Sequence, residues 1–246
     1  MYASARANLK ADVAGSYLNW FWWILEPLGI MAMYAIIFGW LFQNSVEYFP
    51  IFIFSGNMIW AFFNRVVMSS VSLIRSNEML VSKVYVPKYI LLIVEMFING
   101  FKMFIEFCLT IFLMIIFKVQ ITWKVVEIIP VLIVLFVVAF GLGMVLLNFG
   151  VYIDDLGHAM VILMNVWMYF SGIFYDIRSM IPEPFSNLLL SLNCPAFLIH
   201  SFRTAFIYGG DIDFKELLVW LFIGVILSIM GVIIVNKNEN DYVKRM

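Results

Sequence analysis

Residues 125–152 read VVEIIPVLIVLFVVAFGLGMVLLNFGVY, and no other part of the chain says as much about its architecture. Glu127 is the only charged residue in this run. A helix needs roughly 20 apolar residues to cross the hydrocarbon core of a bilayer, and this run is longer than that. The sequence therefore predicts an all-α integral membrane protein.

Further apolar runs lie on both sides of this one, at residues 20–42, 48–71, 89–117, 159–175 and 217–235. The whole chain is 64% hydrophobic and 13% charged, whereas a soluble domain is about half apolar and about a quarter charged. Together the runs predict six transmembrane helices in a single domain covering residues 1–246. Lys and Arg are more frequent on the side that holds both ends of the chain, so both termini are expected to be cytoplasmic.

Two segments outside the runs are predicted to lie in or on the membrane. In residues 1–19, Ala5, Leu9 and Val13 recur at helical spacing, which favours an interfacial amphipathic helix over a solvated tail. Residues 177–215 contain apolar pieces too short to cross a bilayer, broken at Pro195. This pattern favours re-entrant helices on the outer side over a surface domain. Residues 236–246 are expected to form a short polar tail.

Several functions are excluded by the composition. The formal net charge is -1 and the basic residues are scattered, so nucleic acid is not an expected partner. No Lys follows a Gly, which rules out a phosphate-binding P-loop. The histidines His158 and His200 lie in different segments, and Cys108 and Cys194 lack metal-ligand spacing. We therefore expect no catalytic site, metal or cofactor in this chain, and energy must come from a partner or a gradient.

A polar stripe runs along the predicted third span. Its members are separated by four, three and four residues, which places them on one helical face: Glu95, Asn99, Lys102 and Glu106. Charged side chains in a span usually turn away from lipid. Two interpretations stay open, a hydrophilic strip along a substrate conduit and a structural Lys102–Glu106 ion pair. Arg65, in the second span, is expected to snorkel to the cytoplasmic interface.

Aromatic residues make up 18% of the chain. Many of them are expected to form the interfacial belts that Trp and Tyr favour in membranes. Three that lie deeper, Tyr34, Trp167 and Tyr175, are candidates for the wall of a conduit.

Residues 73–88 form a short, charged segment that joins the second and third spans and ends near Pro87. The positive-inside rule places this segment in the cytoplasm. A polytopic membrane protein with no soluble domain has few uses for such a segment, and contact with a soluble motor protein is one of them.

Several motifs resemble those of the permease subunits of ABC-2 type exporters, above all exporters of O-antigen, capsular polysaccharide or teichoic acid. They are WILEPL at residues 23–28, FGWLF at 38–42, SKVYVP at 82–87, YIDDLGH at 152–158, SGIFY at 171–175, and the segment from Asn193 to Arg203. Gly172 stands where the family often has Pro, Cys194 separates Asn193 from Pro195, and Asp154 follows Ile153 where an Arg is frequent.

The resemblance implies a homodimeric pore bound to two cytoplasmic ABC ATPase subunits, which would hold ATP and Mg. It implies that residues 73–88 couple the chain to those ATPases through Glu78, Ser82, Lys83, Val84, Tyr85 and Pro87. The expected function is export of a lipid-linked surface polysaccharide across a bacterial plasma membrane. The alternatives are an ABC-2 permease for a drug, peptide or lipid, and an integral membrane enzyme or scaffold.

Overall fold

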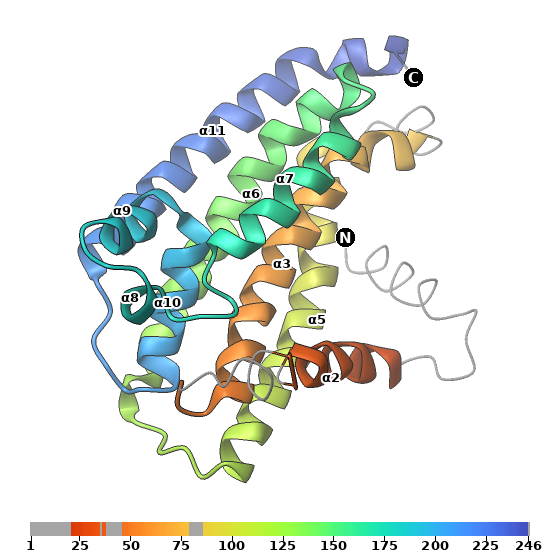
Figure 1. Ribbon diagram of the computed structural model, residues 1–246. Helices are drawn as coiled ribbons and strands as arrows, with labels where there is room; N and C mark the ends of the chain where they lie inside the picture. The colour runs from red at the N-terminus through yellow and green to blue at the C-terminus, as the bar shows by residue number, and fades with distance from the viewer. Residues whose placement is uncertain (1–20, 35, 38–45, 79–85, 246) are drawn as a thin grey trace.

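The computed structural model describes residues 21–34, 36–37, 46–78 and 86–245 (Figure 1). Within these ranges the ordered elements are helices and no strand occurs. They are α2 (Trp22–Tyr34), α3 (Phe49–Ser76), α5 (Lys88–Ile116), η3 (Trp123–Glu127), α6 (Ile128–Tyr152), α7 (Leu156–Phe170), α8 (Ile177–Met180), α9 (Phe185–Leu192), α10 (Cys194–Phe206) and α11 (Phe214–Arg245). The predicted all-α class is confirmed. The predicted interfacial helix at residues 1–19 lies outside the described residues.

Four helical segments are long and apolar enough to cross a bilayer, namely Phe49–Ser76, Lys88–Ile116, Trp123–Tyr152 and Phe214–Glu239. A fifth is possible if the bent pair α9 and α10 counts as one span. The predicted spans at residues 20–42 and 159–175 correspond to α2 and α7, which have 13 and 15 residues and fall short of the required length. The chain is thus a multi-pass helical membrane protein, and six spans stay a prediction.

α3 is the central helix of the bundle. It packs against α5, α6, α7 and α10. Of its most apolar stretch of 18 residues, 72% is buried inside the protein. α6 lies along α3 and carries α11 on its other side (Figure 1). Glycines allow these close approaches, because a Cβ at Gly150 would overlap the carbonyl of Val71 and one at Gly141 would lie 2.8 Å from the carbonyl of Gly224.

The outward faces of α5, α7 and α11 are covered by large apolar side chains. Ile162 on α7 and Phe222 on α11 are both about two-thirds exposed, and α7 buries only Met160 and Met164. Such surfaces would be a liability in water, but they suit contact with lipid or with another membrane helix. α11 continues as a helix through residues 236–245, the part of the chain expected from the sequence to form a short polar tail. Buried contacts of its last turns, described below, explain the difference.

The connection between α7 and α11 contains the short helices α8, α9 and α10. α9 and α10 meet at Asn193 with a bend of 104°. The Asn193 side chain caps α10 by accepting a hydrogen bond from the backbone N–H of Ala196 at 3.2 Å. A pair of short apolar helices joined by a sharp bend is the local structure predicted for residues 177–215. We call this end of the bundle the hairpin end.

Candidate coupling end and polar stripe

The opposite end of the bundle is where α3 ends, α5 begins, the α6–α7 connection turns and α11 reaches its last turns (Figure 1). We call it the coupling end, because the described flanks of the predicted coupling segment, residues 73–78 and 86–88, lie there. Ser82, Lys83, Val84 and Tyr85 fall in residues 79–85, outside the described residues. Of the flanking residues, Glu78 is exposed just beyond α3, and Pro87 is the N-cap of α5.

Arg75 connects the last turn of α3 to the α6–α7 connection. Its Nη2 donates a hydrogen bond to the carbonyl of Val151 at 3.2 Å and forms an ion pair with the carboxylate of Asp154. Both charged side chains are exposed, so the ion pair contributes at most about 1 kcal/mol to stability. Asp154 is one of the positions at which the chain departs from the family pattern, and here it has a defined partner.

Lys88 anchors the other end of the segment. Its side chain is 3% exposed, and its Nζ lies 3.2 Å from Oε1 of Glu239 on α11 and donates to the carbonyl of Val86 at 3.1 Å. A cation buried this deeply is tolerated only when it is paired. This pair ties the first turn of α5 to the extended end of α11.

The same end of α11 is fixed by neutral hydrogen bonds to α6. Oδ1 of Asn148 accepts from Nδ2 of Asn238 at 2.9 Å and from the hydroxyl of Tyr242 at 2.8 Å. Burial raises the pKa of Tyr242, so its hydroxyl stays protonated and keeps its proton to donate. These bonds explain why the polar sequence after residue 235 continues the helix. The segment between Arg75 and Lys88 is therefore attached at its two ends to two different helix pairs.

The polar stripe lies on the inward face of α5, as predicted. Asn99 and Glu106 are buried and Glu95 and Lys102 are half-buried, whereas the opposite face exposes Phe97, Phe101 and Phe104. Asn99 bonds within its own helix, where Nδ2 donates to the carbonyl of Glu95 at 2.9 Å.

The partner of Glu106 differs from the expected one. Its Oε1 accepts a hydrogen bond from Nη2 of Arg65 on α3 at 2.8 Å, so the ion pair bridges two helices. The prediction that Arg65 snorkels to the interface was wrong, because a buried carboxylate lies within its reach. Arg65, and not Lys102, is therefore the ion-pair partner of Glu106. The charges of Lys102 and Glu26 also act on Glu106 electrostatically.

Three buried polar atoms, two of this ion pair and one of the residue that precedes Arg65 on α3, have no hydrogen-bond partner in the described part of the chain. They are Oδ1 of Asn64, Nε of Arg65 and Oε2 of Glu106. Buried polar atoms are almost always satisfied by protein or by water. The place where α3 meets the stripe on α5 thus keeps unused hydrogen-bonding capacity, of both donor and acceptor kinds.

The three aromatic candidates gather around the end of α7. Trp167 packs edge-on against Phe63 with ring centroids 5.4 Å apart, and its indole N–H donates to Oδ1 of Asn193 at 2.9 Å. Tyr34 stands edge-on to Phe174 at 4.8 Å. The hydroxyl of Tyr175 donates to the carbonyl of Tyr169 at 2.9 Å. The indole N–H of Trp167 and the hydroxyl of Tyr175 thus already have partners within the chain.

The sequence identified Arg203 only as the last residue of a motif and did not predict its role as a buried hydrogen-bond donor. Arg203 is buried in α10, and its guanidinium donates to the carbonyls of Phe52, Gly172 and Ile173 at 2.7 to 3.0 Å. It also lies over the ring of Phe52, 3.4 Å from the centroid. The available signal was a single cation inside the apolar residues 196–207, with no acidic residue among them to balance it.

No cluster of three or more potential metal ligands occurs among the residues that the structure describes. The described residues form the helical bundle of a membrane protein, with a polar stripe turned inward.

The chain belongs to the ABC-2 type transporter family, whose model matches residues 2–207. It is similar to the O-antigen export system permease protein RfbA of Myxococcus xanthus, with 26% identity over 220 residues that cover 89% of this chain and 85% of the relative. It is also similar to the protein of the same name from Klebsiella pneumoniae, with 22% identity over 231 residues that cover 94% and 88%. The chain is thus an ABC transporter permease.

Proposed function

We propose that this chain is the membrane-spanning subunit of an ATP-driven exporter that moves a lipid-linked surface polysaccharide, of the O-antigen type, across a bacterial plasma membrane. One observation carries the proposal. Two relatives from different bacteria, matched over most of their length, are both O-antigen export system permease proteins. Capsular polysaccharide and teichoic acid are cargoes of the same general chemistry.

In this proposal two copies of the chain form the pore and two cytoplasmic ATPase subunits, which hold ATP and Mg, drive it. Residues 73–88 contact the ATPase and are displaced when it changes conformation. The contact residues are Glu78, Ser82, Lys83, Val84, Tyr85 and Pro87. The ion pairs of Arg75 and Lys88 support this role, because they would pass a displacement of the segment to the α6–α7 connection and to α11.

The proposed conduit runs beside the polar stripe on α5. The unsatisfied atoms of Asn64, Arg65 and Glu106 support a wet path there, since hydroxyl-rich sugars and water both supply the missing donors and acceptors. Glu95, Asn99 and Lys102 extend the path along the helix. The aromatic rings of Tyr34, Trp167 and Tyr175 would offer apolar faces to passing sugar rings.

The topology that we propose has six spans, with both termini in the cytoplasm and an interfacial helix at residues 1–19. In it, α2 and α7 each cross together with adjoining residues, and residues 177–215 re-enter from the outer side. The arrangement of α3, α5, α6 and α11 supports this, because α3, α6 and α11 end and α5 begins at the same end of the bundle, where the predicted cytoplasmic connections lie (Figure 1).

Reconstitution tests the function. The permease is purified from native membranes with its ATPase subunit and placed in liposomes, and ATP hydrolysis is measured with added polyprenyl-linked glycan, polyprenyl phosphate or a hydrophobic drug. We expect stimulation by the glycan lipid and not by polyprenyl phosphate alone. Stimulation by the drug together with indifference to the glycan would replace the proposal with a drug, peptide or lipid exporter. Failure to recover any ATPase subunit would favour a membrane enzyme or scaffold.

A further inference from the structure

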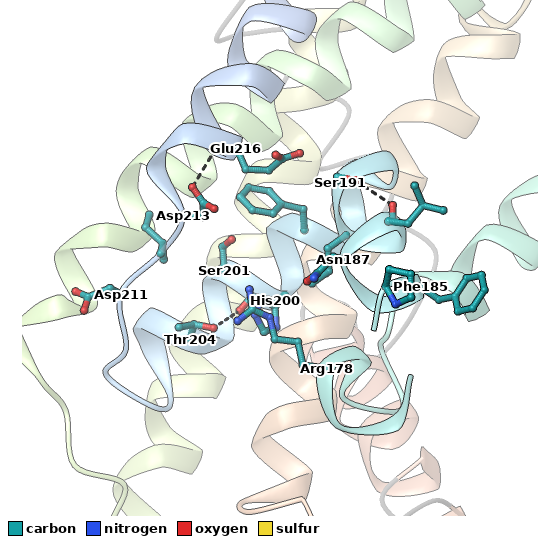
Figure 2. Close-up of a pocket in the computed structure, with 15 residues that line it drawn as sticks. Arg178, Phe185, Asn187, Ser191, His200, Ser201, Thr204, Asp211, Asp213 and Glu216 are labelled. Carbon is teal, nitrogen blue, oxygen red and sulfur yellow. Dashed lines mark hydrogen bonds between the residues drawn. The ribbon is translucent and has the colours of Figure 1, made fainter. Parts of the chain in front are cut away.

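A pocket of about 710 Å³ lies at the hairpin end, between α8, α9 and α10 and the beginning of α11. Its size falls in the range of small-ligand sites, about 300–1,000 Å³. Figure 2 shows the side chains that line it, which come from all four helices and from the α10–α11 connection. The pocket is separate from the polar stripe and from the coupling end.

Two opposite charges face the pocket from opposite sides. Figure 2 shows Arg178 on one side and Glu216 on the other, with His200, Ser201 and Asn187 between them. The other two acidic lining residues are already engaged. Asp211 forms an ion pair with Lys124, and Asp213 caps α11 by accepting hydrogen bonds from the backbone N–H groups of residues 215 and 216.

Arg178 and Glu216 are not engaged in this way. Among the described residues, neither the Arg178 guanidinium nor the Glu216 carboxylate has an ion pair or a side-chain hydrogen bond. The pocket therefore offers one free cation and one free anion at a distance from each other. A ligand that satisfies both must carry an anionic group and a cationic group of its own.

The rim of the pocket is apolar and exposed. Phe185 and Leu188 of α9 line it and are 64% and 54% exposed, and Leu218 of α11, two residues after the lining residue Glu216, is also exposed. In a multi-pass membrane protein, side chains of this kind are suited to the acyl chains of neighbouring lipids. The charged pocket thus opens beside a surface on which hydrocarbon chains can lie.

We propose that this pocket binds the headgroup of a zwitterionic phospholipid with a primary ammonium group, as in phosphatidylethanolamine. Arg178 binds the phosphate and Glu216 accepts hydrogen bonds from the ammonium group. The amide of Asn187 and the hydroxyl of Ser201 bond to the ester oxygens between them. A neutral sugar would leave both charges unpaired, and an anionic headgroup such as that of phosphatidylglycerol would leave Glu216 without a cation.

The test measures which lipids stay bound to the full-length protein. The protein is incorporated into nanodiscs that contain equal amounts of phosphatidylethanolamine, phosphatidylcholine and phosphatidylglycerol, released, and analysed by native mass spectrometry. We expect about tenfold enrichment of phosphatidylethanolamine over phosphatidylglycerol, the effect of one charge-assisted hydrogen bond. Phosphatidylcholine, whose quaternary ammonium has no N–H to donate, should also be depleted.

Two variants and two controls complete the test. Glu216→Gln should abolish the preference for phosphatidylethanolamine over phosphatidylglycerol while lipid still binds, and Arg178→Gln should lower binding of every phospholipid. Glu183→Gln and Lys215→Gln change exposed charges nearby that do not line the pocket, and should leave the preference intact. Equal retention of the three lipids by the unmodified protein, or an unchanged preference in Glu216→Gln, would overturn the proposal.

Discussion

The two ends of the helix bundle hold their charges in different ways. At the coupling end, Arg75 pairs with an exposed carboxylate, and Lys88 pairs with Glu239 across two helices. At the hairpin end, Arg203 is buried and its guanidinium donates to three backbone carbonyls from two other segments. Arg75 and Lys88 thus have side-chain partners, whereas Arg203 is held by the backbone itself.

This difference bears on which end can move. An exposed ion pair contributes at most about 1 kcal/mol to stability, so little free energy is needed to separate its two side chains. Moving Arg203 away from the Gly172 and Ile173 carbonyls would remove their side-chain donor inside the protein, and each would cost about 1–3 kcal/mol. We therefore expect the Arg75–Asp154 pair to be an adjustable contact of the coupling end and the Arg203 contacts to be a rigid part of the hairpin end.

Replacement of Arg203 should have the largest effect on stability. In Arg203→Met, the carbonyls of Gly172 and Ile173 lose their donor and the contact with the Phe52 ring loses its charge, so we expect a loss of about 3 kcal/mol in the free energy of unfolding. Denaturant titration in detergent micelles measures it. Lys215→Met, at an exposed cation of the same end, is the control and should change stability by less than about 0.5 kcal/mol. Equal stability of the two variants would mean that the hydrogen bonds of Arg203 do not stabilise the hairpin end.

The ion pair between Arg65 and Glu106 should have the next largest effect, and it separates the two interpretations of the stripe. Each single variant, Arg65→Met or Glu106→Leu, leaves one charge unpaired and should lower stability by about 2 kcal/mol, less than for a fully buried pair because Arg65 is 33% exposed. The double variant should regain most of that stability in the same titration, since no unpaired charge is left.

Export by the double variant then decides the role of the pair. If the stripe lines the conduit, the repaired protein is stable and still fails to move glycan lipid into or out of liposomes that contain the ATPase subunit. If the pair is only structural, export returns together with stability. The unsatisfied atoms of Asn64, Arg65 and Glu106 lead us to expect the first result.

Hydrophobic length predicted the long helices well. The predicted spans at residues 48–71, 89–117, 125–152 and 217–235 correspond to α3, α5, η3 with α6, and α11, because a helix needs apolar residues wherever it meets lipid. The span predicted at residues 159–175 was wrong at its C-terminal end. α7 stops at Phe170, and Gly172 follows with a φ of 66°, a conformation that Pro, the residue common in the family at this position, cannot adopt.

Partner choice was harder to predict than position. Spacing along α5 offered Lys102 to Glu106, but only the packing of α3 on α5 brings Arg65 within 2.8 Å. Arg203 shows the same limit, since its acceptors lie 30, 31 and 151 residues away in the sequence. The sequence could indicate that these charges face inward, because lipid excludes them, yet the identity of each partner depends on tertiary structure.

The smallest expected effect on stability belongs to the exposed ion pairs, and it tests the comparison of the two ends most directly. Arg75→Gln removes the pair with Asp154 at the coupling end, and Lys124→Gln removes the pair with Asp211 at the hairpin end. Both should change the free energy of unfolding by less than about 1 kcal/mol. Their effects on glycan-stimulated ATP hydrolysis in liposomes should differ because, of the two, only Arg75 adjoins the segment that we propose to contact the ATPase.

For Arg75→Gln we expect the stimulated rate to fall about two- to fivefold while the basal rate of the ATPase stays the same. For Lys124→Gln we expect no change in either rate. If the two variants lowered stimulation equally, the ends would be equivalent and the motor contact would not pass through Arg75. A loss of stimulation in Arg75→Gln alone would instead mean that a weak, exposed ion pair transmits movement. Its role would then be to connect the end of α3 to the α6–α7 connection, and not to stabilise either of them.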